Sequence, residues 1–364
     1  MKSGDPSASM ALPDPMRGSG RLFMWPSDPA TADLVMGIAM HLRRRFERNE
    51  AHGCVAVHVD ERHAVLILDA LRKHLSAESM LTTRAVYKSG LDEPSIADIP
   101  RAEPLESFIA FARAKWLGDL ITSRRLTAWF QPIVEATQPD NIVAWEALAR
   151  GLSRNTQVPI LPARLLSAAR DAGLVAAFDR FVHEQALTGF VFPDTSEVGL
   201  FLNVTPRTME DPNFDLGHLQ RTAKDLGVAP SRITLELIES ETIADMDRMQ
   251  DVLTYARGLG FGIALDDLGA GFSNLNLIHR LRPDVVKLDM DLTRNIEADN
   301  YKAVLASKVL EATRRLGVRT VAEGVESAAE LAWLVDHGVD YVQGFLIARP
   351  SPTPAVAPRE ILSA

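Results

Sequence analysis

The sequence is short of cysteine, of long apolar stretches and of positive charge. Cys54 is the only cysteine in 364 residues, which excludes a disulfide framework and a zinc site built from cysteines. The apolar run at residues 34–40 is too short to span a bilayer, and no basic segment with a cleavage site precedes it. These absences favour a cytoplasmic protein without a transmembrane segment.

Acidic residues outnumber basic ones, 48 Asp and Glu against 39 Lys and Arg, giving a formal net charge of -9. A chain with this balance has no basic field to attract a nucleic-acid polymer, so DNA and RNA are not expected partners. A small anionic substrate would need local help from a metal ion or from a few placed cations.

Composition and periodicity divide the chain into five segments. They are a disordered leader (1–20), a small α/β domain (21–92), a linker and connecting helix (93–125), a large domain (126–355) and a tail (356–364). Within the small domain we expect a helix at 30–50, strands at 54–59 and 80–87, and a helix from 60. A single helix is expected over 105–125. The small domain contains no catalytic pattern, and its ligand or partner is left open.

The large domain alternates short β-type runs with stretches of helical periodicity. The runs cover 128–134, 142–150, 198–205, 232–239, 260–267, 284–289, 319–325 and 340–347. This alternation predicts a (β/α)₈ TIM-like barrel. Because 135–141 is too short for a helix, the first two strands should pair antiparallel, making the start of the barrel irregular.

The apolar run 260–265 ends in Asp266 and Asp267, and a glycine-rich loop follows. Adjacent residues on a strand point to opposite faces, so the two carboxylates share one pocket only if the backbone turns there. The alternative is a helix cap followed by a turn. Lys287, in the next strand-like run, places a cation where such acids would need one.

Polar residues close or interrupt nearly every strand of the predicted barrel, at the ends where barrel chemistry is found. They are Glu146, Asn203, Glu236, Asp266, Asp267, Lys287, Glu323 and Gln343. Hard oxygen donors without convergent histidine or cysteine suit Mg²⁺ or Mn²⁺. The number of acids suggests two ions bridged by Asp266, an arrangement that can activate water against a phosphoryl group. A merely acidic rim would not explain Lys287 and Asn203.

Glu146-Ala147-Leu148, followed by Arg150, resembles the signature of the EAL family of cyclic di-GMP phosphodiesterases. The similarity covers about residues 126–352 and includes further blocks in the same order. These blocks are 131–134 (QPIV), 203–205 (NVT), 235–239 (LELIE), 266–271 (DDLGAG), 287–289 (KLD), 323–326 (EGVE) and 343–344 (QG).

The resemblance implies a role for each strand-end residue. Glu146, Asn203, Glu236 and Asp266 would hold a first metal, with Asp266 also reaching a second. Asp267 and Glu323 would complete that second site. Lys287 would position and polarise the attacking water, and Gln343 would orient a water ligand. The proton would be taken by the metals alone or by Glu323, and the resemblance leaves both open.

The resemblance also implies contacts around the metals. Arg150 would bind a phosphate, while Gln131 and Leu148 would contact the nucleotide. Glu239 would hold the loop that contains Gly269, Gly271 and Ser273, which resembles the family's gate between metal site and dimer interface. A homodimer through the barrel is therefore expected.

Four positions depart from the family pattern, namely Gly151, Thr205, Ile238 and Leu268, and none of them removes a metal ligand. The implied activity is metal-dependent hydrolysis of cyclic di-GMP to linear pGpG. The alternative is a receptor that binds cyclic di-GMP with weak or no hydrolysis and signals through a partner.

Overall fold

The computed structural model describes residues 18–354 except 91–92, 96–97, 99–101, 153–157, 191, 193–197, 212–213, 238–242, 244 and 269–273. The chain forms two compact units. The first comprises residues 1–124 with 163–174, and the second comprises 125–162 with 175–364.

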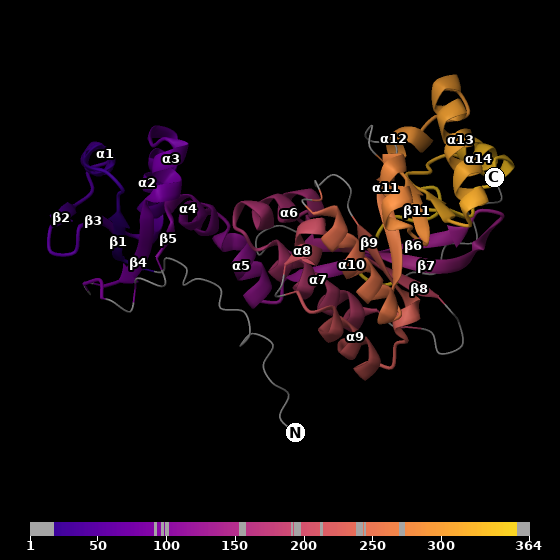
Figure 1. The fold of residues 1–364 in the computed structure, drawn as a ribbon, viewed down its shortest axis with the longest axis horizontal. Coiled ribbons are helices and arrows are strands. Elements are labelled where there is room, and N and C mark those ends of the chain that lie inside the picture. The colour runs from indigo at the N-terminus through magenta and orange to yellow at the C-terminus, as the bar shows by residue number, and fades with distance from the viewer. Residues whose placement is uncertain are drawn as a thin grey trace. The chain divides into compact units, whose positions relative to one another are not determined.

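The first unit contains a five-stranded antiparallel sheet in the order β2-β3-β1-β4-β5. Its elements are β1 (Gly20–Trp25), α1 (Pro29–His41), β2 (Phe46–Asn49), β3 (Cys54–Val59), α2 (Glu61–His74), α3 (Ala77–Thr82), β4 (Arg84–Ser89), β5 (Glu103–Pro104), α4 (Leu105–Arg113), α5 (Lys115–Thr122) and α6 (Pro162–Asp171). Alternate residues of the sheet point to opposite faces. Leu22, Met24, Val55 and Val57 share one apolar core with buried residues of α1 to α4, so the helices cover one face (Figure 1).

Several local predictions for this unit are wrong. The expected helix at 30–50 ends at His41, because Arg43 takes a left-handed backbone (φ 55°), and β2 follows. The expected strand at 80–87 begins only at Arg84, since Ser76 caps a short helix, α3, before it. The expected helix at 105–125 is two helices, α4 and α5, separated at Ala114.

The segment predicted as a linker also contributes to the first unit. It supplies the edge strand β5, and two of its acids form ion pairs with the sheet. Glu93 lies 2.8 Å from Arg21, and Asp98 lies 2.8 Å from Lys88. These contacts attach the segment to the sheet before the chain reaches α4.

The second unit is a closed eight-stranded barrel, which confirms the predicted fold. Its strands are β6 (Leu126–Glu135), β7 (Gln138–Gly151), β8 (Gly199–Val204), β9 (Ile233–Leu237), β10 (Gly262–Leu268), β11 (Val285–Leu288), β12 (Arg319–Ala322) and β13 (Tyr341–Val342). Its helices are α7 (Val175–Gly189), α8 (Pro206–Glu210), α9 (Leu216–Asp225), α10 (Met246–Gly258), α11 (Asn274–Leu281), α12 (Met290–Thr293), α13 (Asn300–Leu316) and α14 (Ala328–Asp336).

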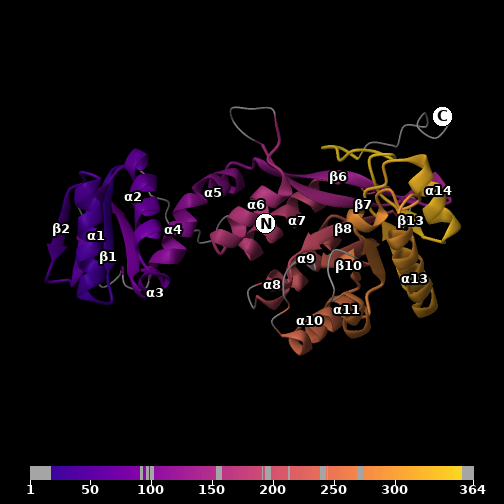
Figure 2. The ribbon, with the colours of Figure 1, turned by 90° about the horizontal axis from the view of Figure 1, so that it is seen from above.

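The irregular start of the barrel is confirmed. β6 and β7 form a long antiparallel hairpin, visible as adjacent ribbons in both views, and β6 is also antiparallel to β13 (Figures 1 and 2). The other neighbouring strands are parallel. The last strand is shorter than predicted, because pairing with β12 covers only Tyr341 and Val342.

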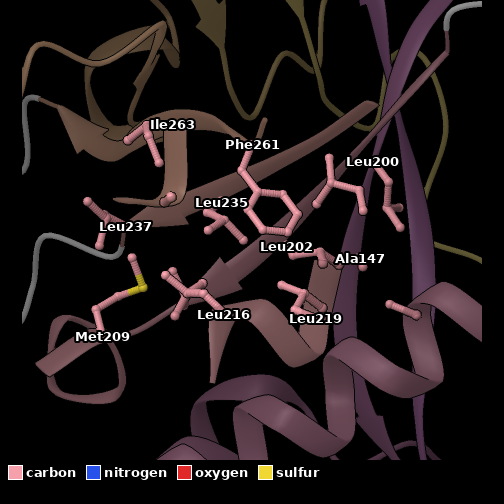
Figure 3. Close-up of a cluster of buried hydrophobic side chains, with 14 of the residues drawn as sticks. Ala147, Leu200, Leu202, Met209, Leu216, Leu219, Leu235, Leu237, Phe261 and Ile263 are labelled. Carbon is pink, nitrogen blue, oxygen red and sulfur yellow. The ribbon is translucent and has the colours of Figure 1, made fainter. Parts of the chain in front are cut away.

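Side chains of the barrel strands alternate between the barrel interior and the surrounding helices. The interior layer consists of Ile133, Ala144, Phe201, Ala264, Val285 and Val321, one from each of six strands. The outward residues belong to a larger cluster shared with the helices. Figure 3 shows Leu200, Leu202 and Leu235 of this cluster near Leu216 and Leu219 of α9. No helix in the described part of the chain is long and apolar enough to cross a membrane.

Candidate active site

A buried lysine is the centre of the polar cluster inside the barrel. Lys287 on β11 has no exposed surface, and its Nζ lies 3.6 Å from Glu146, 3.3 Å from Asp266 and 2.6 Å from Glu323. It also donates a hydrogen bond to Glu236, which is equally buried. The four acids come from β7, β9, β10 and the segment directly after β12.

Asp266 and Asp267 do face one pocket, for a reason that the structure makes explicit. Asp267 has a left-handed backbone (φ 60°), and the pairing of β10 with β11 shifts register between Leu265 and Leu268. The bulge cancels the normal alternation, so consecutive side chains turn to the same side. Asp266, Asp267 and Glu323 bring carboxylate oxygens within 4.8 Å of one another.

A second group of carboxylates lies equally close together. Glu146, Glu236 and Glu323 also place oxygens within 4.8 Å of one another, so Glu323 belongs to both groups. Sequence reasoning expected Asp266 to be the shared member. In this arrangement Asp266 contacts Lys287, and Glu323 lies between the two groups.

Amide side chains fix the orientation of Glu146. Asn203 Nδ2 donates to Glu146 Oε1 over 2.9 Å, and Gln343 Nε2 donates to Glu146 Oε2 over 2.7 Å. Gln343 also donates to Gln131 Oε1 over 3.2 Å, and Gln131 donates to the carbonyl oxygen of Ala348 over 3.1 Å. The structure therefore brings the predicted amides and acids into one connected network.

Burial and mutual repulsion raise the pKa values of several acids in this network. Desolvation raises the pKa of Glu323 to about 8 and that of Asp267 to about 6, and neighbouring carboxylates add to both shifts. Desolvation also raises the pKa of Glu236 far above its usual range, although the Lys287 charge opposes this. The surrounding carboxylates overcome the desolvation of Lys287 and raise the pKa of its ammonium. The cluster thus holds more negative charge than one ammonium can balance.

The donor set fits divalent metal ions that prefer oxygen. Among the described residues, Glu236 Oε2 and Gln343 Oε1 are buried oxygens without a hydrogen-bond donor, and Asp266 Oδ1 has only the 3.3 Å ion-pair contact with Lys287 Nζ. Carboxylate and amide oxygens are the ligands that Mg²⁺ and Mn²⁺ select, and a cation would relieve both the missing donors and the excess negative charge. The acidic groups therefore could bind metal.

The predicted substrate contacts lie along the β6–β7 hairpin. Arg150 is buried, donates to the carbonyl oxygen of Ala149 and places its guanidinium 5.5 Å from the ring of Trp129. Trp129 pairs with Leu148 across the hairpin, as Gln131 pairs with Glu146. A flat ring beside a cation can stack on a base, so Trp129 is a candidate substrate contact that sequence reasoning missed. The available signal was its position two residues before Gln131.

His183 on α7 is a second residue that sequence reasoning missed. Its Nε2 donates to the backbone carbonyl of Asn203 over 2.7 Å, and its ring is buried against Phe214. Desolvation lowers the pKa of His183 to about 4, so the ring is neutral at physiological pH. It therefore secures the strand segment that presents Asn203. No sequence motif indicates this contact, because it depends on how α7 packs on β8.

Five of the predicted residues lie outside the described part of the chain, namely all four loop-stabilising residues and one departure from the family pattern. They are Glu239, Gly269, Gly271, Ser273 and Ile238. Their proposed roles stay predictions.

Comparison with known proteins agrees with this geometry. The sequence profile of the EAL domain matches residues 114–350. The chain belongs to the EAL domain family. The resemblance inferred from the strand-end motifs is thereby confirmed.

Two curated relatives carry names that state an activity. The cyclic di-GMP phosphodiesterase PdeR of Escherichia coli is 28% identical over 245 residues, which cover 66% of this chain and 36% of PdeR. The cyclic di-GMP phosphodiesterase PA2567 of Pseudomonas aeruginosa is 33% identical over 193 residues, 52% of this chain and 33% of that protein. The chain thus spans about a third of the length of these relatives.

A solved structure matches the barrel over nearly its whole length. It is the cyclic di-GMP-bound form of a standalone EAL protein from Vibrio cholerae, 30% identical with a TM-score of 0.57. The match covers 66% of this chain and 98% of that protein.

The raised acid pKa values predict how metal-free protein responds to pH. The folded-state pKa of Glu323 is about 8 against an ordinary 4.5, so between these values the folded chain retains a proton that the unfolded chain releases. The contribution of Glu323 to the free energy of unfolding is therefore greatest below pH 4.5 and is lost as the pH rises to 8. His183, whose pKa is lowered from 6.5 to about 4, gives the opposite slope below pH 6.5. We therefore expect Tm in EDTA to fall between pH 6.5 and 8, and Mg²⁺ to restore it at the upper end.

The matched control is Glu323→Gln, which cannot release this proton and should show a shallower decline. The measurement is the Tm of wild type and of Glu323→Gln in EDTA at a series of pH values between 4.5 and 8. Equal slopes for wild type and variant would contradict the assignment.

Proposed function

We propose that the barrel is a metal-dependent phosphodiesterase that opens one phosphodiester of cyclic di-GMP to give linear pGpG. The observation that carries the proposal is the complete set of acids around Lys287, with unsatisfied oxygens directed at a site suited to Mg²⁺ or Mn²⁺. The names of the relatives and the nucleotide in the Vibrio cholerae structure support the choice of substrate.

Two divalent ions would be held by Glu146, Asn203, Glu236, Asp266, Asp267 and Glu323. When bound, they supply charge neutralisation for the phosphoryl group and lower the pKa of water. Gln343, already hydrogen-bonded to Glu146, would also orient a water ligand.

Lys287 and Glu323 would act on the attacking water. Three hydrogens on Lys287 Nζ allow it to hold the water and face the negative charge that develops during attack. Glu323 Oε1 lies 2.6 Å from Nζ, and its side chain retains 19% exposure, so it is accessible to solvent. The proton of that water would be taken by Glu323 as general base or be released through the action of the metal ions alone.

Arg150, Gln131, Leu148 and Trp129 would orient the substrate. The guanidinium of Arg150 has no acidic partner in direct contact among the described residues, so its charge is available for a phosphate. Leu148 and Trp129 form an apolar surface beside it, on which a guanine base can pack. The proposal places the protein in the cytoplasm, in keeping with a single, buried cysteine.

The direct test is turnover of cyclic di-GMP followed by chromatography of the products. Addition of Mg²⁺ or Mn²⁺ should yield pGpG, and EDTA or Ca²⁺ should prevent it, because Ca²⁺ prefers more ligands at longer distances. Binding of cyclic di-GMP without product under these conditions would reject the enzyme and establish the receptor alternative.

Lys287→Ala separates catalysis from charge balance. An interaction made mainly in the transition state affects kcat, whereas one made equally with the bound substrate affects KM. We expect kcat to fall about 10³-fold with KM within about tenfold of wild type. Arg150→Ala is the control and should raise KM as well. The decisive measurement is kcat of Lys287→Ala across a Mg²⁺ titration, because recovery to the wild-type rate would leave Lys287 only a charge-balancing role.

The proposal includes a homodimer formed through the barrel. Tyr301, Val304 and Leu305 on α13 are 86%, 53% and 61% exposed and share one side of the helix, an apolar surface suited to a second copy. Leu305→Glu should shift the sedimentation of the full chain toward the monomer. Leu226→Glu is the matched control and should leave the sedimentation unchanged, since Leu226 is 46% exposed at the end of a different helix, α9. A wild-type protein that remains monomeric at high concentration contradicts this part of the proposal.

A further inference from the structure

The first unit contains a cleft of about 420 Å³ at one end of its five-stranded sheet. This end is where β1 begins and where β3 and β4 finish, because Gly20 pairs with Val59 on one side and with Ser89 on the other. The lining residues are Ser19, Gly20, Arg43, Arg44, Arg45, His58, Val59, Asp60 and Gly90. We propose that this cleft binds a small soluble ligand carrying more than one phosphate charge.

The charge of the cleft is the first argument. Arg43, Arg44 and Arg45 form the one run of three consecutive cations in a chain whose net charge is -9. Among the described lining residues Asp60 is the single acid, and it already contacts His63 at 2.7 Å and Arg44 at 3.9 Å. Arg43 and Arg45 therefore leave a local excess of positive charge in a protein that is acidic elsewhere.

The backbone at the arginine run is the second argument. Arg43 follows α1, and its left-handed backbone conformation ends the helix. The N–H of Arg43 donates to the carbonyl oxygen of Met40, and the N–H of Arg44 donates to that of Ala39. Glycine is the usual residue in this conformation, and a larger side chain there costs about 1 kcal/mol. An arginine nevertheless occupies this position, although the left-handed backbone favours glycine.

Helix termination alone does not explain the run. Cations near the C-terminus of a helix stabilise its carbonyl groups. Arg44 fulfils this role, since its Nε donates to the carbonyl oxygen of Leu42 over 3.1 Å. The side chains of Arg43 and Arg45 are exposed at the cleft.

The size and lining of the cleft define the ligand class. Its volume falls within the range of roughly 300–1,000 Å³ that is usual for small-molecule sites. Arginine binds phosphate oxygens through paired hydrogen bonds. A Cβ atom on Gly90 would have no neighbour within 4 Å, so the backbone there leaves room for a ligand. Among the described lining residues His58 is the only one with an aromatic ring, so we expect charge to dominate recognition.

The test is calorimetric titration of the full chain with inorganic pyrophosphate in EDTA. Arg43→Gln/Arg45→Gln should weaken binding about tenfold or more, because two charged contacts are lost. The matched control is Arg72→Gln/Lys73→Gln, which removes two exposed charges from α2 outside the cleft and should leave the affinity within about twofold. Orthophosphate should bind about tenfold more weakly than pyrophosphate.

Arg43→Gly guards against a folding artefact, because glycine relieves the left-handed backbone while removing one charge. It should weaken pyrophosphate binding without lowering Tm. Absence of pyrophosphate binding by wild type, equal losses in the two double variants, or equal affinities for the two phosphates would each overturn the proposal. Loss of binding in Arg150→Ala but not in Arg43→Gln/Arg45→Gln would assign the anion to the barrel and also overturn it.

Discussion

The ion cluster around Lys287 is the constraint on which the rest of the barrel depends. A buried ammonium and several buried carboxylates each lose several kcal/mol of hydration, which only their mutual attraction and further hydrogen bonds can offset. Glu146 meets this need through Lys287, Asn203 and Gln343, which come from three other strand ends. The acids still outnumber the ammonium, so the protein alone leaves a site with an unmet requirement for positive charge. A divalent cation could supply this charge.

Strand periodicity explains why so much of the site could be predicted from sequence. Five inward polar residues each lie two positions beyond an inward apolar residue. The pairs are Ala144 with Glu146, Phe201 with Asn203, Ala264 with Asp266, Val285 with Lys287 and Val321 with Glu323. An apolar layer therefore seals the barrel directly beneath the charged layer. Because a period of two can be read from the chain, the strands, their order and their inward ends were all accessible.

The features that sequence reasoning missed depend on tertiary packing or on a single unusual backbone angle. The early end of α1 depends on Arg43 adopting a conformation that its residue type disfavours. The contact of His183 with Asn203 depends on the packing of a helix against a strand, and the apposition of Trp129 and Arg150 on hairpin register. Asp267 was assigned to the right pocket, but the bulge that directs it there has no signature in the local sequence.

The short β13 has a consequence for how the protein reaches its active form. β6 and β7 pair across a tight turn and can form early, since their contacts are local. Closure instead joins Tyr341 and Val342 to residues of β6 more than two hundred positions earlier, through a seam only two residues long. Gln343 follows this seam directly and completes the hydrogen bonding of Glu146. The hydrogen bonding of Glu146 thus depends on the most distant pairing among the barrel strands, and an incompletely closed chain would lack it.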